Sequence, residues 1–193
     1  MNMEMVTAIA LGVALSASCG FRVFVPMLVA SVAAHFGLFP AQEGFQWLGS
    51  WPAMICFGTA TVIEIIAYYF PFVDNLLDSV TTPLSVGAGT LLLTSVLPID
   101  NDMLKWLTGF IVGGGIAALV QGSTVLTRLT STHLTAGTAN PVVATGEHAA
   151  AIGSSLLSLV IPIIVVTVLV LLAIVMIVVF RKKLFRKKGA PAT

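Results

Sequence analysis

The sequence predicts an all-α integral membrane protein with about six transmembrane or re-entrant helices. Of its 193 residues, 58% are hydrophobic and 9% are charged, and apolar runs follow one another almost end to end, as expected of a chain that folds in lipid. Six of the nine basic residues gather over residues 181–188, directly after the last apolar run. Under the positive-inside rule, such a tail lies in the cytoplasm. We therefore predict one helical membrane domain, residues 1–180, and a basic cytoplasmic tail, residues 181–193.

The first apolar run, residues 5–36, is too long for one simple crossing. A straight helix of that length would measure about 48 Å, whereas the hydrocarbon core of a bilayer is about 30 Å thick. Gly20, Arg22 and Pro26 lie near its middle, and glycine and proline both weaken the interior of a helix. We predict a broken or kinked helix at this point.

A polar loop and two further runs follow. Residues 37–50 form the loop, and Trp47 and Trp51 at its end are typical anchors at a membrane interface. The second run covers residues 52–70, and the third covers only residues 84–98. The segment between these two runs is expected to lie at the membrane edge.

Small residues recur at four-residue intervals in the first run and in the fourth, residues 103–126. The first run contains Gly12 and Gly20, and the fourth contains Gly109 and Gly113. Such spacing permits close approach of helix backbones, although membrane helices are rich in small residues in any case. We expect these two runs to make the tightest helix contacts. In one possible arrangement they pack against each other.

The last third of the chain begins with a stretch of low apolar content. We expect residues 128–146 to form a polar loop or irregular backbone that lines a cavity. The final run, residues 149–180, is interrupted by Pro162. Residues 89–98 and 153–162 share their length, end residues and hydroxyl positions. An internal repeat of the kind found in transporters would produce this similarity. Chance would also produce it, because apolar segments use few residue types.

Loop charges suggest an orientation. The 37–50 loop has no basic residue and is expected outside, whereas the stretch that starts at Arg128 is expected inside. If the N-terminus is cytoplasmic, this orientation places the C-terminal tail in the cytoplasm only when one long run crosses the membrane twice or forms a re-entrant segment. We therefore predict six segments with both ends in the cytoplasm.

The sequence contains no motif of a soluble enzyme. A phosphate-binding glycine loop, an HExxH motif, a nucleophile elbow and metal-ligand spacings are all missing from it. We therefore expect a protein that is not an enzyme, with no metal, no cofactor and no nucleic-acid partner. Cys19 and Cys56 lie in separate runs and are interpreted as small core residues.

Arg22 is the candidate of most interest, because it lies in an apolar run with no other charge. An uncompensated guanidinium costs at least about 2.5 kcal/mol in hydrocarbon, so one that is retained usually has a function. Beside a helix break it could bind a phosphate or carboxylate group; alternatively, it forms a structural ion pair with Glu64. Glu64 could instead be a proton-coupling carboxyl, because burial disfavours its charged form, or extend to the membrane interface.

Two pairs of ionisable residues complete the set of candidates. Asp74 and Asp78 are four residues apart and share a face on any helix, where they could bind a cation, cap a helix or remain solvated. Glu147 and His148 begin the final apolar run. They could interact with the helix dipole, or relay protons if a third group lay between them and the site.

Several short motifs resemble those of one known family. They are Gly20-Phe21-Arg22 followed by Pro26, the segment from Glu64 to Asp78 with its Pro71-x-x-Asp74-x-x-x-Asp78 core, Gly87 to Gly89, and the stretch from Arg128 through Asn140 to Glu147. In these residues the chain resembles a widespread bacterial family of integral membrane proteins, the domain of unknown function numbered four-one-two-six. The resemblance implies a location in the bacterial inner membrane and a set of shared residues, without an activity.

Our leading hypothesis is a small inner-membrane transporter or permease-like protein, forming a homo-oligomer among membrane lipids. Arg22, Arg128 and Asn140 would bind a small anion or an anionic lipid head group. Proton or ion coupling would fall to Glu64, Asp74, Asp78, Glu147 and His148. One alternative is a structural or scaffold protein whose buried charges only fix helix packing, and another is a cation channel lined by Asp74 and Asp78.

Overall fold

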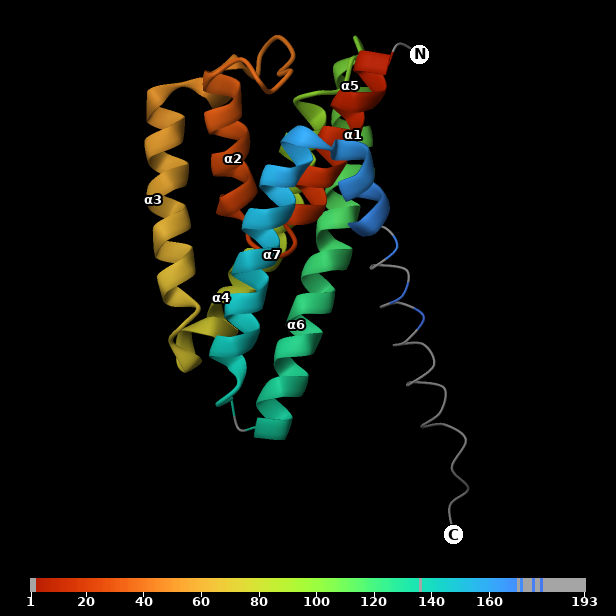
Figure 1. The fold of residues 1–193 in the computed structure, drawn as a ribbon. Helices are drawn as coiled ribbons and strands as arrows, with labels where there is room; N and C mark the ends of the chain where they lie inside the picture. The colour runs from red at the N-terminus through yellow and green to blue at the C-terminus, as the bar shows by residue number, and fades with distance from the viewer. Residues whose placement is uncertain (1–2, 136, 170, 172–174, 176–177, 179–193) are drawn as a thin grey trace.

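The computed structural model describes residues 3–135 and 137–169 and the single residues 171, 175 and 178. Over this part the chain is helical and has no strand (Figure 1), so the predicted all-α class is confirmed there. Among the described residues, two stretches are long and apolar enough to cross a membrane, Leu76–Thr94 and Asp102–Thr135. The predicted basic tail, residues 181–193, lies outside the described residues.

The first two helices, α1 (Met3–Ser18) and α2 (Phe24–His35), form a hairpin that turns back about halfway along the molecule (Figure 1). The first apolar run is therefore broken, as predicted, between Ser18 and Phe24. Helices of 16 and 12 residues measure about 24 and about 18 Å, so neither would cross a hydrocarbon core of about 30 Å. Pro26 lies in the first turn of α2, where a proline removes no helical hydrogen bond.

This hairpin overturns part of the predicted topology. Because the first run reverses instead of crossing, the start of α1 and the 37–50 loop lie at the same end of the molecule (Figure 1). Glu4 and Leu38 line one cavity there. The predictions of a cytoplasmic N-terminus and of an external 37–50 loop therefore cannot both be correct. Residues 137–139 lie at the opposite end, so this loop and the 37–50 loop are on opposite sides, as predicted.

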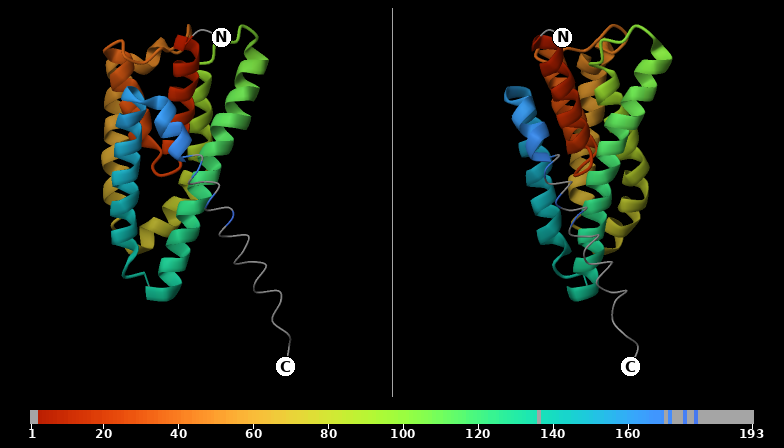
Figure 2. Two further views of the ribbon diagram at one scale, coloured as in Figure 1. Left: turned by 45° about the vertical axis from the view of Figure 1, so that its right-hand side comes forward. Right: turned by 90° about the vertical axis from the view of Figure 1, so that its right-hand side faces the viewer.

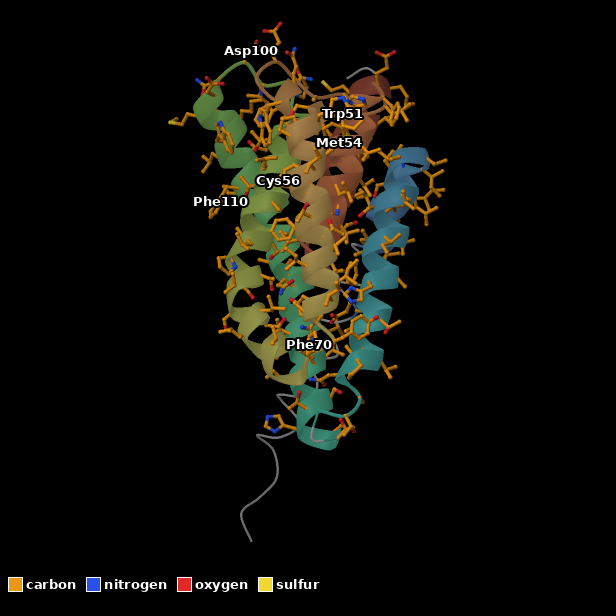
Figure 3. The ribbon with its side chains drawn as sticks, turned by 90° about the vertical axis from the view of Figure 1, so that its left-hand side faces the viewer. Trp51, Met54, Cys56, Phe70, Asp100 and Phe110 are labelled. Carbon is orange, nitrogen blue, oxygen red and sulfur yellow. The ribbon has the colours of Figure 1, made fainter. Side chains whose placement is uncertain are left out.

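A short 3-10 turn, η1 (Gln46–Gly49), leads into α3 (Trp51–Ala67), which packs against α2 (Figure 1). Ser50 caps α3 by accepting the backbone N–H of Ala53. Trp51 and Phe70 lie at opposite ends of this helix (Figure 3). Cys56 is exposed on α3, so its assignment to the core was wrong, whereas Cys19 is buried.

The next helix, α4 (Pro71–Thr94), begins well before the predicted third run. It continues through Pro83, so Asp78 belongs to a long helix and not to a connection at the membrane edge. Asp78, Thr81 and Ser85 are buried at helical spacing, which gives this helix a polar stripe that faces inward. A search for apolar runs misses such a helix, because its buried face is the polar one.

Three consecutive segments, α5 (Asp102–Thr108), the π-helical η2 (Gly109–Gly114) and α6 (Gly115–Thr135), form one continuous stretch. The polar loop predicted over residues 128–146 is mostly helical, since α6 extends to Thr135 and α7 begins at Asn140. The hydroxyls of this stretch donate to carbonyls four residues earlier, as Thr132 does to Arg128. In this way threonine satisfies its polar group within the helix, and the helix continues.

Glycines bring η2 against α4 with direct backbone contact. A Cβ placed on Gly89 of α4 would lie 2.7 Å from the carbonyl oxygen of Gly113 in η2. Gly109 packs on Thr94 of α4, and Gly12 of α1 packs on Leu93 of α4 and on Val96 just after it. Both glycine-containing runs therefore use α4 as their common partner.

The two runs also pack on each other. Gly20, just after α1, packs against Ala117 and Val120 of α6, and Ala14 and Ala17 of α1 share an apolar cluster with Val120. The predicted contact between the first and fourth runs is therefore present, and both runs also pack on α4.

The seventh helix, α7 (Asn140–Val160), ends just before Pro162, the predicted break. Residues 162–169 are helical and turn back along α1 and α6 (Figure 2). Val165 and Leu169 join Ala14 and Val120 in a small apolar cluster. Residues 89–98 and 153–162 both contain the end of a helix, α4 and α7, and the internal repeat stays a prediction.

Apolar side chains cover much of the outside of the described part. Charged residues in or beside its loops, such as Glu43, Asp100 and Asp102, are exposed, whereas those in the middle of the bundle are buried. Leu126 and Ile55 are among many large hydrophobic residues that are exposed. In contrast, Arg22 and Arg128 are the largest side chains that are almost fully buried. A soluble protein has the reverse distribution.

Candidate functional site

The hairpin turn brings one buried cluster of charged groups together at the middle of the bundle. Its members come from the turn after α1, the end of α3, and helices α4, α6 and α7; they are Arg22, Tyr68, Asp78, Arg128, Glu147 and His148. All six side chains are at least nine-tenths buried. We call this group the central cluster.

Arg22 is held by two neighbouring residues of α7. Its Nη1 lies 2.9 Å from Oε2 of Glu147, and its Nε donates to Nδ1 of His148 at 2.8 Å. Because a guanidinium always carries its Nε proton, Nδ1 of His148 must accept, and the proton of the neutral imidazole is on Nε2. The guanidinium therefore bridges Glu147 and His148, and a proton relay through this pair stays a prediction.

Arg128 binds a carboxylate on each of two other helices. Its Nη1 donates to Oδ1 of Asp78 at 2.6 Å, and its Nη2 donates to Oε2 of Glu147 through a short hydrogen bond. One oxygen of Glu147 is therefore shared between the two buried arginines. Asp78 is engaged inside the protein, so the solvated and helix-capping interpretations of this residue were wrong.

Tyr68 is a member of the cluster that the sequence analysis did not identify as a site residue. The guanidinium carbons of Arg22 and Arg128 lie 3.7 and 4.5 Å from the centre of its ring. Its hydroxyl donates to Oδ1 of Asp78 at 3.2 Å and lies 3.0 Å from Oγ1 of Thr81. A signal was available: Tyr68 lies four residues after Glu64, on the same face of α3.

Glu64 does not pair with Arg22. Its two carboxylate oxygens accept the backbone N–H groups of Val23 and Phe24 at 2.8 and 3.0 Å, where α2 begins. The carboxylate thereby satisfies two of the donors that a helix N-terminus leaves open, and its charge is favoured by the helix dipole. With 4% of its surface exposed, Glu64 does not extend to the membrane interface.

The remaining predicted ligands lie around the cluster. Asn140 is buried at the start of α7, and its amide donates to Oγ1 of Thr132 at 2.9 Å. Asp74 lies in the first turn of α4, and its side chain is outside the described part of the structure. Among the described residues, no three His, Cys, Asp or Glu side chains are placed to hold a metal ion.

The formal charges of the central cluster sum to zero, but some of its polar atoms have no hydrogen-bond partner. Arg22 and Arg128 carry two positive charges, and Asp78 and Glu147 carry two negative ones. Nevertheless Nε of Arg128, Oε1 of Glu147 and Nε2 of His148 are buried without a hydrogen-bond partner. Buried polar groups of this kind are rare and need an explanation, such as a water or an ion that binds there.

The fold and the cluster together define a class: an all-helical protein with an apolar surface, a half-length hairpin and buried ion pairs at its centre. The chain belongs to the family described as a domain of unknown function (DUF4126), whose model matches residues 9–182. Comparisons with curated proteins and with solved structures find no match.

Proposed function

We propose that this chain is a multi-pass membrane transporter that binds a small anion together with a proton at the central cluster. The observation that carries the proposal is the sharing of one oxygen of Glu147 by Arg22 and Arg128. Two guanidiniums compete for this oxygen, so either of them is available to another anion once a carboxylate of the cluster is neutralised. The anion would carry a carboxylate or phosphate group, which guanidinium binds well.

Membrane insertion is supported by the distribution of side chains. Exposed apolar residues cover the described helices, while both arginines and the carboxylates that bind them are buried, and two stretches have the length and composition of a membrane span. A bacterial inner membrane, contact with its lipids and assembly as a homo-oligomer fit this surface and are part of the proposal.

Coupling between the proton and the anion follows from electrostatics. In a medium of low dielectric constant, an uncompensated charge is expensive, and the cluster is neutral when both of its carboxylates are ionised. A proton on Asp78 or Glu147 leaves one excess positive charge, which a monoanion cancels. Proton and anion would therefore enter and leave together.

The α1–α2 hairpin provides a structural basis for such a site. Transporters often form their substrate sites near the bilayer midplane from discontinuous helices, because a helix break frees polar backbone groups there. Here the break carries Arg22, and both arginines are 1% exposed. This arrangement corresponds to a closed state, from which substrate exchange requires a movement of helices.

The proposal is tested with the full chain in proteoliposomes that contain a pH-sensitive dye. Gluconate, chloride and inorganic phosphate are supplied in turn outside, and vesicles with and without phosphatidylglycerol separate a soluble anion from a lipid head group. We expect one anion to drive acidification of the lumen, with a rate at least tenfold lower in Arg22→Met. Lys105→Met, which removes a basic residue of α5 outside the cluster, should leave the rate unchanged.

A binding measurement keeps the test decisive if Arg22→Met does not fold. Glu147→Gln preserves the shape of the side chain but removes its charge, so the anion that protects the wild type from thermal unfolding at pH 5 should also protect this variant at pH 8. No anion-driven acidification in the wild type, or an equal rate in a folded Arg22→Met, would overturn the proposal.

The second candidate is a scaffold protein, which is favoured by the charge balance of the cluster without any ligand. It predicts that substitutions in the cluster lower the melting temperature and that no anion moves in the same assay. The cation-channel alternative receives no such support, because Asp78 is paired with Arg128 at 2.6 Å, and a fixed guanidinium repels cations.

A further inference from the structure

A second cavity lies beside the central cluster, between α4 and α6. Its volume is about 530 Å³, and its walls include Asp78, Thr82, Leu129, Thr132 and His133. Asp78 is the residue that belongs both to this cavity and to the ion pairs of the cluster. The cavity therefore reaches the cluster from one side.

We propose that this cavity is an aqueous vestibule through which protons reach Asp78, and that Asp78 is the proton acceptor of the protein. This inference rests on the proposed function and adds the group that takes the proton and the end of the molecule from which it comes. A hydronium ion in the vestibule would transfer its proton to the Asp78 carboxylate and leave a water molecule. Arg128 would then lose one of its two counter-charges.

The composition and the position of the walls support water in this cavity. The carboxylate of Asp78 and the imidazole of His133 are polar groups in its wall. Thr82 and Thr132 donate their hydroxyl protons to helix carbonyls, and their oxygens can still accept; cavities with several polar partners hold water, whereas purely apolar ones stay dry. His133 is exposed and lies two residues before the end of α6. The vestibule is thus at the end of the bundle that holds the α6–α7 connection (Figure 1).

The surroundings of Asp78 make its charge responsive to a proton. Arg128 and Tyr68 bind the same oxygen, Oδ1, while Glu147 and Arg22 act from α7 and from the hairpin turn. His133 lies in the wall of the vestibule. Protonation of Asp78 removes the anion closest to Arg128, so the effect reaches Glu147 and Arg22 through the guanidinium.

Thiol labelling tests the vestibule without any measurement of transport. In a Cys56→Ser background, Leu129→Cys places a thiol in the vestibule wall, and Leu126→Cys places one on the same helix outside it. The two leucines are matched, with exposed fractions of 43% and 42%. The thiolate is the nucleophile that attacks thiol reagents, and it forms in water and not in lipid. Leu129→Cys should therefore react at least tenfold faster than Leu126→Cys with a charged, membrane-impermeant reagent.

The labelling should also occur from one face of sealed vesicles only. Equal rates for the two thiols, or no reaction of Leu129→Cys from either face, would overturn the vestibule. Infrared titration identifies the acceptor: the band of a protonated carboxyl that appears at low pH should disappear in Asp78→Asn and persist in Glu147→Gln. Loss of the band in Glu147→Gln alone would overturn the assignment of Asp78.

These outcomes are independent of the proposed function. One-sided labelling and a band assigned to Asp78, combined with no anion-driven acidification, would overturn transport while the vestibule and its acceptor remain. Anion transport that depends on Arg22, combined with an unreactive Leu129→Cys, would retain transport and overturn the vestibule.

Discussion

The carboxylate of Glu64 on α3 accepts the backbone N–H of Val23 at 2.8 Å, at the point where the α1–α2 hairpin turns back. Its second oxygen accepts the N–H of Phe24. A side chain from one helix thus completes the first turn of another, deep inside the bundle. The hairpin turn depends on this contact because Val23 is buried and Phe24 is half-buried, so the carboxylate replaces the water that would otherwise accept from their N–H groups.

Removal of the Glu64 carboxylate should destabilise the protein more than a change of its charge does. Glu64→Ala leaves two buried donors open, at about 1–3 kcal/mol for each, whereas Glu64→Gln retains one acceptor oxygen. We expect melting temperatures in detergent to follow the order wild type, Glu64→Gln, Glu64→Ala. Equal melting temperatures for the wild type and Glu64→Ala would show that the contact does not stabilise the hairpin.

Arg22 should be coupled energetically to Glu147 more strongly than to Glu64. Truncation of one partner of a buried ion pair typically costs about 3–5 kcal/mol, because the other charge is left without compensation. In a double-mutant cycle, Arg22→Met with Glu147→Gln should therefore recover much of the loss. The cycle with Glu64→Gln is the control, and a larger interaction energy in that cycle would contradict the pairing described above.

The ring and the hydroxyl of Tyr68 should contribute separately. Tyr68→Phe keeps the ring under both guanidiniums and removes the hydrogen bond to Asp78, at a cost of about 1 kcal/mol. Tyr68→Leu also removes the cation–π contacts, which are worth up to about 2 kcal/mol each when desolvated. Chemical unfolding should rank the leucine variant as clearly less stable; identical midpoints for the two variants would exclude a role for the ring.

Gly89 should not tolerate alanine, whereas Gly87 on the same helix should. A Cβ on Gly89 would meet the backbone of Gly113 at 2.7 Å, but a Cβ on Gly87 would meet nothing within 4 Å. Overpacking of this kind costs about 1–3 kcal/mol. The melting temperature of Gly89→Ala should fall, and that of Gly87→Ala should stay the same or rise slightly. Similar values for both would contradict the close α4–η2 contact.

The all-α class, the break in the first run and the end of α7 could be predicted from the sequence, because each has a local cause. Apolar composition determines the class, Gly20 lies beside the first break, and Pro162 marks the second. The early start of α4 was missed because its polar residues, such as Asp78, face inward. A protein with an apolar surface reverses the pattern on which the search relied.

Partners within the central cluster could not be predicted from spacing. Arg22 and Glu147 are 125 residues apart in the sequence, and their contact depends on how α7 packs against the hairpin turn. The sequence identified Arg22, Asp78, Arg128 and Glu147 as candidate site residues, and the one ion pair that it offered as an alternative, Arg22 with Glu64, is not formed. Tyr68 was overlooked because an aromatic residue at a helix end suggests a membrane interface.

The hydrogen bonds between Glu64 and the start of α2 also join α3 to α2. Since α3 is tied to α2 at that point and packs along it, these two helices are joined into one unit, which we call the arm. The main chain of Arg22 belongs to the edge of this arm, while its guanidinium is fastened to α7 across the seam. The hydroxyls of Tyr69 and Thr145 meet across the same seam at 3.1 Å. Any movement of the arm away from α7 must therefore break the contacts of Arg22 with Glu147 and His148. The guanidinium is thus a group that holds the arm against α7.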